Sequence, residues 1–266
     1  LQLKNGRFDF SGGASMVLAA IGAGYVGQHT GSMWAAFATA IALGVVLSMG
    51  TAIVYIVGRL PIIICTIGMT LLYESLTYLL FGGQGIRGFY STPALSQMGR
   101  MPLVLLPAVL AMILFVVYTY FTASGRRGKI LANNQSAGVN IGINENKNVF
   151  VSYIFSGLII GLAAIVYISQ NDVTPQSGLA TSSIMFSYIV PVFMGTFIGL
   201  ASNDVIGIAI AAIGMEILNY GLNCLNLGAG GWQQIIMGIF VLGFYTFSSQ
   251  SGRIAAFFEK RKAVRA

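Results

Sequence analysis

Long apolar stretches, separated by short polar loops, fill almost the whole of this 266-residue chain. A helix needs about 20 apolar residues to cross the roughly 30 Å of hydrocarbon in a bilayer. The apolar runs are continuous and do not alternate with a period of two, so they indicate helices and not the strands of a barrel. We expect eight spans, at about 12–28, 33–57, 61–81, 102–122, 149–170, 184–200, 205–225 and 232–250.

The composition agrees with a chain whose solvent is lipid. Hydrophobic residues make up 56% of it and charged residues 8%, whereas soluble domains carry about 25% charged residues. The fold class predicted is therefore an all-α, polytopic transmembrane helical bundle. The first and sixth stretches are short and rich in small residues, so either is a candidate for a broken or re-entrant helix. Transport, channelling, signalling and intramembrane catalysis are the functions open to such a protein.

The positions of lysine and arginine predict the orientation in the membrane. If the loop at about 123–148 is cytoplasmic, twelve of the fourteen basic residues lie inside, and Arg87 and Arg100 lie outside. This arrangement predicts a multi-pass protein of the cytoplasmic membrane with both ends of this chain in the cytoplasm. The net charge of +7 is then a signal of topology. It does not indicate nucleic-acid binding, because the charges occupy short segments beside the membrane.

Motifs for enzymatic chemistry are missing from the sequence. Residues 83–88 match G-x-G-x-x-G, but a span precedes them and an irregular loop with Pro93 follows, whereas a dinucleotide site needs a strand before and a helix after. There is no phosphate-binding G-x-x-x-x-G-K-[ST] motif, no H-E-x-x-H and no G-x-S-x-G. Cys65 and Cys224 lie in apolar runs and form no metal-binding pair. We expect no catalytic residues, no metal site and no cofactor in this chain.

Polar residues inside the apolar stretches are candidates for a substrate path, because burying them in lipid costs free energy. Glu216, Asn219, Tyr220 and Asn223 follow the spacing i, i+3, i+4, i+7, which places them on one helix face. Glu216 lies about 17 Å from the cytoplasmic end of its span, near the midplane. A network of hydrogen bonds between helices explains the same pattern equally well. Glu74, in the outer half of its span, is expected to face a vestibule or to pair with a neighbour.

Small residues recur at the spacing that lets membrane helices approach closely. Gly157 and Gly161 are four residues apart, as are Gly195 and Gly199. These pairs predict a compact bundle and carry no information about function.

The longest cytoplasmic loop, at about 123–148, holds a short and mildly amphipathic stretch. Its candidate partner-binding residues are Asn133, Asn134, Gln135, Ser136, Ala137, Val139, Asn140, Ile141 and Gly142. Ala137, Val139 and Ile141 are the apolar side chains that a groove on a partner would accept. A helix that lies on the bilayer surface is the alternative.

Three stretches of the sequence resemble the permeases of the ribose-type family of ABC importers. Residues 128–147 resemble the family's coupling loop, in which a Gly-Asn-Glu-Ala-Ala run leads into a Gly-Ile-Asn-Val-x-Lys ending. The matching positions are Asn134, Gln135 (where glutamate is usual), Ala137, Gly142, Ile143, Asn144 and Lys147. Residues 5–13 resemble a Gly-Gly-Ile-Asp-Leu-Ser-x-Gly segment through Asp9 and Ser11, with Asn5 and Gly12 as departures. Residues 218–223 resemble a Leu-Asn-Asn-Gly-Leu-Asn stretch of the same family.

The resemblance implies a permease domain over residues 1–266 in a family with about ten spans. It implies these partners: a second permease copy, identical or paralogous, two ATPase subunits that bind ATP and magnesium, and an extracytoplasmic solute-binding protein. The cytoplasmic loop would couple ATP hydrolysis to access, and the solute expected is a monosaccharide. Nucleoside and branched-chain amino acid permeases of the same kind remain open, as do an ion-gradient-driven secondary transporter, with Glu216 or Glu74 as the ion site, and a non-transporting scaffold.

The predicted orientation can be tested with single cysteines at Ser136 and at Gly230, in a protein that lacks Cys65 and Cys224. We expect an impermeant thiol reagent added outside intact cells to label Gly230→Cys and not Ser136→Cys. The reverse labelling pattern would show that the orientation is inverted.

Overall fold

The computed structural model describes residues 1–199, 203–227, 232, 235–236, 238–243 and 246. Regular structure in these ranges is helical, apart from one isolated antiparallel bridge between Ile86 and Val173. The chain divides into two compact units, Leu1–Met185 and Phe186–Ala266, and each is described by itself. The single permease domain expected over the whole chain stays a prediction.

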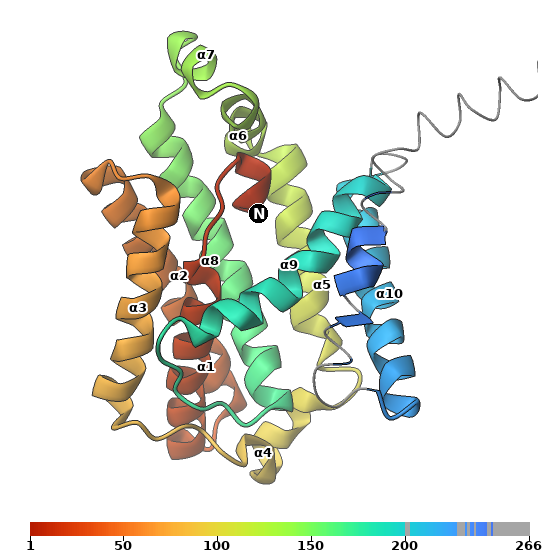
Figure 1. Ribbon diagram of the computed structural model, residues 1–266. Coiled ribbons are helices and arrows are strands. Elements are labelled where there is room, and N and C mark those ends of the chain that lie inside the picture. The colour runs from red at the N-terminus through yellow and green to blue at the C-terminus, as the bar shows by residue number, and fades with distance from the viewer. Residues whose placement is uncertain (200–202, 228–231, 233–234, 237, 244–245, 247–266) are drawn as a thin grey trace, which may run out of the picture. The chain divides into compact units, whose positions relative to one another are not determined.

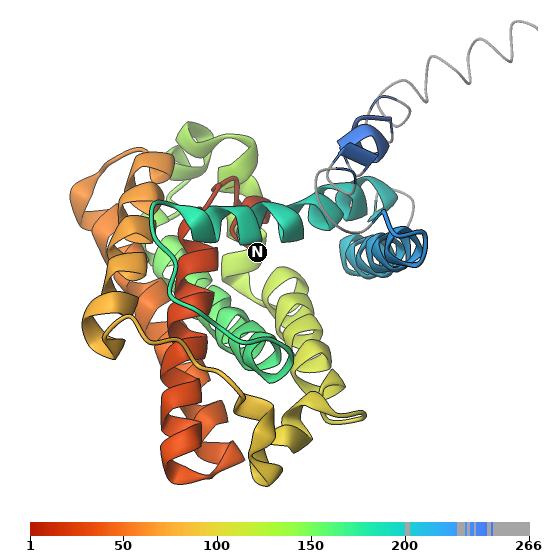
Figure 2. The ribbon, with the colours of Figure 1, turned by 60° about the horizontal axis from the view of Figure 1, so that its bottom comes forward.

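The first unit contains five helices of ten residues or more that run through the bundle, together with short helices in its loops (Figures 1 and 2). The long ones are α1 (Ser11–Thr30), α2 (Met33–Gly58), α3 (Ile62–Phe81), α5 (Leu105–Val116) and α8 (Glu145–Gln170). The shorter ones are η1 (Leu3–Asn5), η2 (Phe89–Ser91), α4 (Pro93–Ser96), η3 (Gln97–Gly99), the π-helical turn η4 (Val117–Phe121), α6 (Ala123–Asn133) and α7 (Gln135–Asn140). Helix α9 (Ala180–Gly199) begins in this unit, and α10 (Asp204–Cys224) belongs to the second.

The all-helical membrane fold is confirmed. Among the described residues, five helices are long and apolar enough to cross a membrane: α2, α3, α8, α9 and α10. A sixth candidate is the pair Leu105–Phe121 and Ala123–Asn133, which is bent by 72°. The expected broken helix is therefore present, at the inner end of the fourth predicted span. The first predicted span is the 20-residue helix α1, and most of the last, at 232–250, lies outside the described residues.

Helix α1 lies at the centre of the first unit. It packs against α2, α3 and α8, and most of its residues are buried. Gly22 and Gly27 face the side chains of Leu43 and Ala36 so closely that a Cβ atom would clash with them. A helix rich in glycine and alanine has a small cross-section, so three neighbours can surround it. This explains why α1 is less apolar than the helices around it although it is more deeply buried.

Helices α2 and α8 touch through their backbones. A Cβ atom built on Gly44 of α2 would lie 2.5 Å from the carbonyl oxygen of Gly157, and one on Gly161 would lie 2.6 Å from that of Ala40. Real Cβ atoms do not approach other atoms so closely, so only glycine fits at these positions. The predicted packing role of Gly157 and Gly161 is confirmed. We call this contact the glycine seam, and it consists of Gly44, Gly157 and Gly161.

The start of α9 lies inside the first unit. The segment 171–179 runs from the end of α8 along α3, and its successive contacts pair Val173 with Ile86, Pro175 with Tyr78, and Leu179 with Glu74. Glu74 precedes the end of α3 by seven residues, or about 10 Å along the helix axis. Helix α9 therefore begins below the outer end of α3, as Figure 1 shows. The sixth predicted span thus begins after a segment that re-enters the bundle.

The second unit repeats the use of glycine at a close helix contact. Gly195 and Gly199 of α9 face Ile208 and Asp204 of α10, and Gly207 faces Gly195 in return. Met194, Ala211 and Met215 form a small buried cluster beside this contact. The packing role predicted for Gly195 and Gly199 is confirmed within this unit.

The glycine seam generates a stability prediction. Gly44→Ala places a methyl group against the backbone of α8, so α2 and α8 must separate. We expect the free energy of unfolding to fall by about 1–3 kcal/mol, measured by thermal unfolding of the purified protein in detergent. Gly68→Ala is the matched control, because Gly68 lies inside α3 with no atom within 4 Å of a Cβ at that position. Equal stability of the two variants would contradict the seam.

Candidate functional site

The loop predicted to contact a partner folds into two helices, α6 and α7, at one end of the first unit (Figure 1). All nine residues predicted to contact the partner are exposed to solvent. The apolar side chains among them are included, since Val139 is 46% and Ile141 is 70% exposed. Exposed apolar side chains on a short helix outside the membrane suit a contact with another protein.

Local hydrogen bonds fix the shape of α7. The Asn134 side chain accepts a hydrogen bond from the backbone N–H of Ala137 (3.0 Å), which caps the first turn. Gly138 is the buried residue of α7, and a Cβ atom there would lie 2.8 Å from the Leu131 side chain of α6. Gly142 has φ +88°, a conformation that favours glycine. These residues turn the chain sharply and leave the rest of α7 outward.

A side-chain hydrogen bond joins α7 to the first turn of α8. Gln135 Nε2 donates to Glu145 Oε1 at 2.7 Å. Glu145 is the first residue of α8, after the cap Asn144, whose side chain accepts from the N–H of Lys147. A carboxylate is stabilised at a helix N-terminus by the unpaired N–H groups there. Gln135, predicted from its position in the loop, therefore has a defined partner that sequence analysis did not identify.

Buried polar side chains lie beneath this loop and connect it to the start of the chain. The Arg7 guanidinium donates to Asn148 Oδ1 (3.0 Å) and to Ser152 Oγ (3.4 Å) on α8. Asn148 Nδ2 in turn donates to the carbonyl oxygen of Ser124 in α6 (2.7 Å). Arg7 is 6% exposed, and a buried charge requires such partners. We call Arg7, Ser124, Asn148 and Ser152 the basal cluster.

The segment that resembles the family at residues 5–13 packs against the same region. Asn5, a departure from the family pattern, is buried and donates from Nδ2 to the Tyr118 hydroxyl (2.9 Å). Asp9 accepts from the backbone N–H and the hydroxyl of Ser11 (2.8 and 2.7 Å), which explains why this pair belongs together before a helix. Burial raises the pKa of the Asp9 carboxyl, and the hydrogen bonds from Ser11 oppose this shift.

Glu74 is a buried carboxylate that holds the start of α9. Its side chain is 2% exposed. Oε2 accepts from the N–H of Leu179 (2.8 Å), and Oε1 accepts from the N–H (2.8 Å) and the hydroxyl (2.6 Å) of Thr181. Leu179 has φ +68°, which is strained for a residue with a side chain. The structure therefore gives Glu74 the pairing with a neighbour that was one of its two expected environments.

The four polar residues predicted on one helix face all lie on α10. Glu216, Tyr220 and Asn223 are exposed, and Asn219 is half-buried. An open concavity of about 450 Å³ on α10 is lined by Ala212, Ile213, Glu216, Ile217 and Tyr220. The helix geometry brings these side chains together as expected, and their role as a substrate path stays a prediction.

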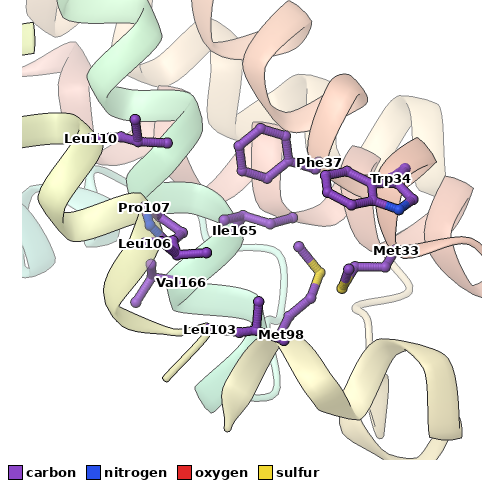
Figure 3. A pocket seen from close by; sticks show the side chains of 10 residues that line it. All are labelled: Met33, Trp34, Phe37, Met98, Leu103, Leu106, Pro107, Leu110, Ile165 and Val166. Carbon is purple, nitrogen blue, oxygen red and sulfur yellow. The ribbon is translucent and has the colours of Figure 1, made fainter. Parts of the chain in front are cut away.

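Two further hollows lie in the first unit. One, of about 220 Å³, has an apolar lining between α2, α5 and α8, with only the indole N–H of Trp34 as a polar group (Figure 3). Its residues are Met33, Trp34, Phe37, Met98, Leu103, Leu106, Pro107, Leu110, Ile165 and Val166. Such a lining offers almost no hydrogen bonds to a polar solute.

The second hollow is polar and lies on the predicted outer side. Its volume is about 570 Å³, and it is lined by Gln28, Gly83, Gln84, Gly85, Arg87, Thr174 and Pro175. The G-x-G-x-x-G segment forms part of it, with Gly85 against the carbonyl oxygen of Val173 and Gly83 at φ +71°. Helix α3 precedes this segment, so the glycines serve a close backbone contact and a turn, and the strand that a dinucleotide site needs is not there.

The described part of the chain holds no group of three or more His, Cys, Asp or Glu side chains that could bind a metal ion. Residues 1–245 match the model of a protein family described as the permease component of the branched-chain amino acid transport system. The chain belongs to this permease family. It is a multi-pass membrane protein and a transport subunit.

Individual relatives are importers of small solutes. The chain is 28% identical over 251 residues to the ribose import permease protein RbsC of Escherichia coli strain K12, which covers 91% of this chain and 77% of the relative. It is 27% identical over 235 residues to the autoinducer 2 import system permease protein LsrD of Photorhabdus temperata (85% and 70%). It is 27% identical over 245 residues to LsrC of Enterobacter sp. strain 638 (89% and 69%). No solved structure matches the chain.

The contrast between two glutamates gives a prediction. In Glu74→Gln the new NH₂ group faces the donors of Leu179 and Thr181, so at least one buried N–H loses its acceptor. We expect the free energy of unfolding to fall by about 1–3 kcal/mol, measured by thermal unfolding in detergent. Glu216→Gln makes the same change at an exposed site and should leave stability unchanged. A stable Glu74→Gln variant would show that these hydrogen bonds do not hold α9.

Proposed function

We propose that this chain is the membrane-spanning subunit of an ATP-driven importer that takes up a monosaccharide-like solute. A second permease copy would complete the path, two ATPase subunits would bind ATP and magnesium below it, and an extracytoplasmic binding protein would deliver the solute. The surface formed by α6 and α7 would receive the ATPase. Both ends of this chain would then lie in the cytoplasm.

The observation that carries this proposal is the exposure of α7. Its nine predicted contact residues are all exposed, and Val139 and Ile141 present apolar surface to water. An amphipathic helix held outside the bundle is suited to a groove on a partner. Since the chain has no phosphate-binding loop of its own, a partner must supply ATP hydrolysis.

The solute class rests on the relatives and on the chemistry of α10. The relatives named above import ribose and autoinducer 2, whereas the family description names branched-chain amino acids. The proposed path residues Glu216, Asn219, Tyr220 and Asn223 offer amide, hydroxyl and carboxylate groups. These groups suit a solute with many hydroxyls, since each can donate or accept a hydrogen bond. An amino acid would also require a partner for its carboxylate, and α10 presents no cation.

The polar hollow beside Arg87 is the surface we assign to the binding protein. It lies at the end of the first unit opposite α7, in the loop between α3 and α4 and the segment after α8. Arg87 and Arg100 are the two basic residues on the predicted outer side. A protein with acidic side chains on its docking face would complement them.

Uptake into proteoliposomes of the assembled complex tests the proposed function. We expect accumulation of a pentose with ATP inside and no ion gradient. In Val139→Glu/Ile141→Glu, charges replace the apolar groups that would enter the partner's groove. Uptake and substrate-stimulated ATPase activity should fall about tenfold or more, because burying a charge in an apolar groove costs over 1.4 kcal/mol.

The control is the isolated permease, which should unfold at the same temperature with and without these substitutions, because both side chains are exposed. Accumulation driven by an ion gradient without ATP, and abolished by Glu216→Gln, would replace this proposal with a secondary transporter. Undiminished ATP-driven uptake by Val139→Glu/Ile141→Glu would remove α7 from the ATPase interface.

A further inference from the structure

We propose that Glu145 is the positioning residue that transmits movement of α7 to the membrane spans. This inference rests on the proposed function, because it assigns the route by which movement at the ATPase reaches the bundle. It is carried by the geometry of the first unit, in which Glu145 meets three helices.

The first connection is to α7. This helix has six residues, and its backbone is fixed by the Asn134 cap and by Gly138 against Leu131. Its direct side-chain bond to a membrane-spanning helix is Gln135 Nε2 to Glu145 Oε1, at 2.7 Å. A displacement of α7 therefore acts on the first turn of α8 through this pair.

The second connection is from α8 to α2. Glu145 begins α8, and α8 meets α2 in the glycine seam, where backbone touches backbone at Gly44, Gly157 and Gly161. Close-packed backbones leave little room for independent movement, so α8 and α2 should shift as one body. Tyr55, near the inner end of α2, also interacts through its hydroxyl with the Glu145 carboxylate. The same carboxylate thus contacts α7 and α2 and is carried by α8.

The chemistry of the pair is directional. A carboxylate only accepts hydrogen bonds, while the Gln135 amide donates. The coupling loops that this chain resembles have glutamate at the position of Gln135 and valine at that of Glu145. In this chain the carboxylate stands on the other member of the pair. A glutamate at 135 would set two negative charges at hydrogen-bond distance, and these would repel each other.

The importance of the pair should grow in the assembled transporter. Gln135 is exposed in the isolated chain, and exposed polar pairs contribute little. An ATPase seated on α7 would exclude water from the contact, and electrostatic interactions strengthen as water is removed. The pair is therefore expected to affect coupling more than it affects the folding of the permease.

A swap of the two residues tests the inference in the reconstituted complex. Gln135→Glu should lower substrate-stimulated ATPase activity and uptake about fivefold, the effect of roughly 1 kcal/mol of repulsion. Adding Glu145→Gln should restore both to near the wild-type level. The amide introduced at 145 can donate to the carboxylate at 135, while its carbonyl oxygen still accepts from Tyr55. Asn146→Glu is the matched control, since it adds the same charge at an exposed neighbouring position and should change neither activity.

Two results would overturn the inference. One is wild-type coupling in Gln135→Glu. The other is a loss in Gln135→Glu that Glu145→Gln does not reverse, which would mean that Gln135 acts through a different contact. Both are distinct from a failure of the proposed function. If the function is correct, Val139→Glu/Ile141→Glu still uncouples the complex whichever way the swap turns out, and if it is wrong, that variant transports normally.

Discussion

Backbone contact between α2 and α8 is the constraint on which the first unit depends. Lipid tails are as apolar as leucine, so apolar side chains gain little by leaving lipid for one another. Helices associate in a bilayer through close packing, and the glycine seam allows the closest approach available. Gly44, Gly157 and Gly161 remove the side chains that would hold the two helices apart. Helix α1 is enclosed beside this pair because it too is built from small residues.

Buried polar groups then fix how the loops attach to this core. Glu74 accepts three hydrogen bonds from the start of α9, and Arg7 donates to Asn148 and Ser152 of α8. In a medium of low polarity an unpaired charge is costly, so each of these groups strongly favours the one arrangement that pairs it. The segment 171–179 is thereby held inside the bundle, and the start of the chain is held beneath α6.

This arrangement explains how a small exposed helix can influence the spans. The basal cluster joins α6 to α8, and the hydrogen bond between Gln135 and Glu145 joins α7 to α8. Helix α8 is in turn inseparable from α2 at the glycine seam. Rigid elements linked by specific contacts can carry a displacement, whereas a flexible loop would absorb it.

The sequence by itself determined the class of fold, the family and the place of the cytoplasmic loop. These depend on local properties, namely the length of apolar runs, the positions of lysine and arginine, and the motifs at residues 128–147. It also predicted the glycine pairs and the shared face of Glu216, Asn219, Tyr220 and Asn223, because helix periodicity fixes both. It did not predict that α7 would be bonded to Glu145 or that Arg7 would be buried.

Only the tertiary structure decided which polar groups meet. Glu74 and Thr181 are over a hundred residues apart, as are Arg7 and Asn148, and no local pattern indicates their pairing. A polar residue in an apolar stretch announces that it needs a partner, because leaving it unpaired in lipid costs free energy. The identity of that partner depends on how the helices cross. That crossing is set by backbone packing at glycines such as Gly44, whose neighbours the linear sequence does not show.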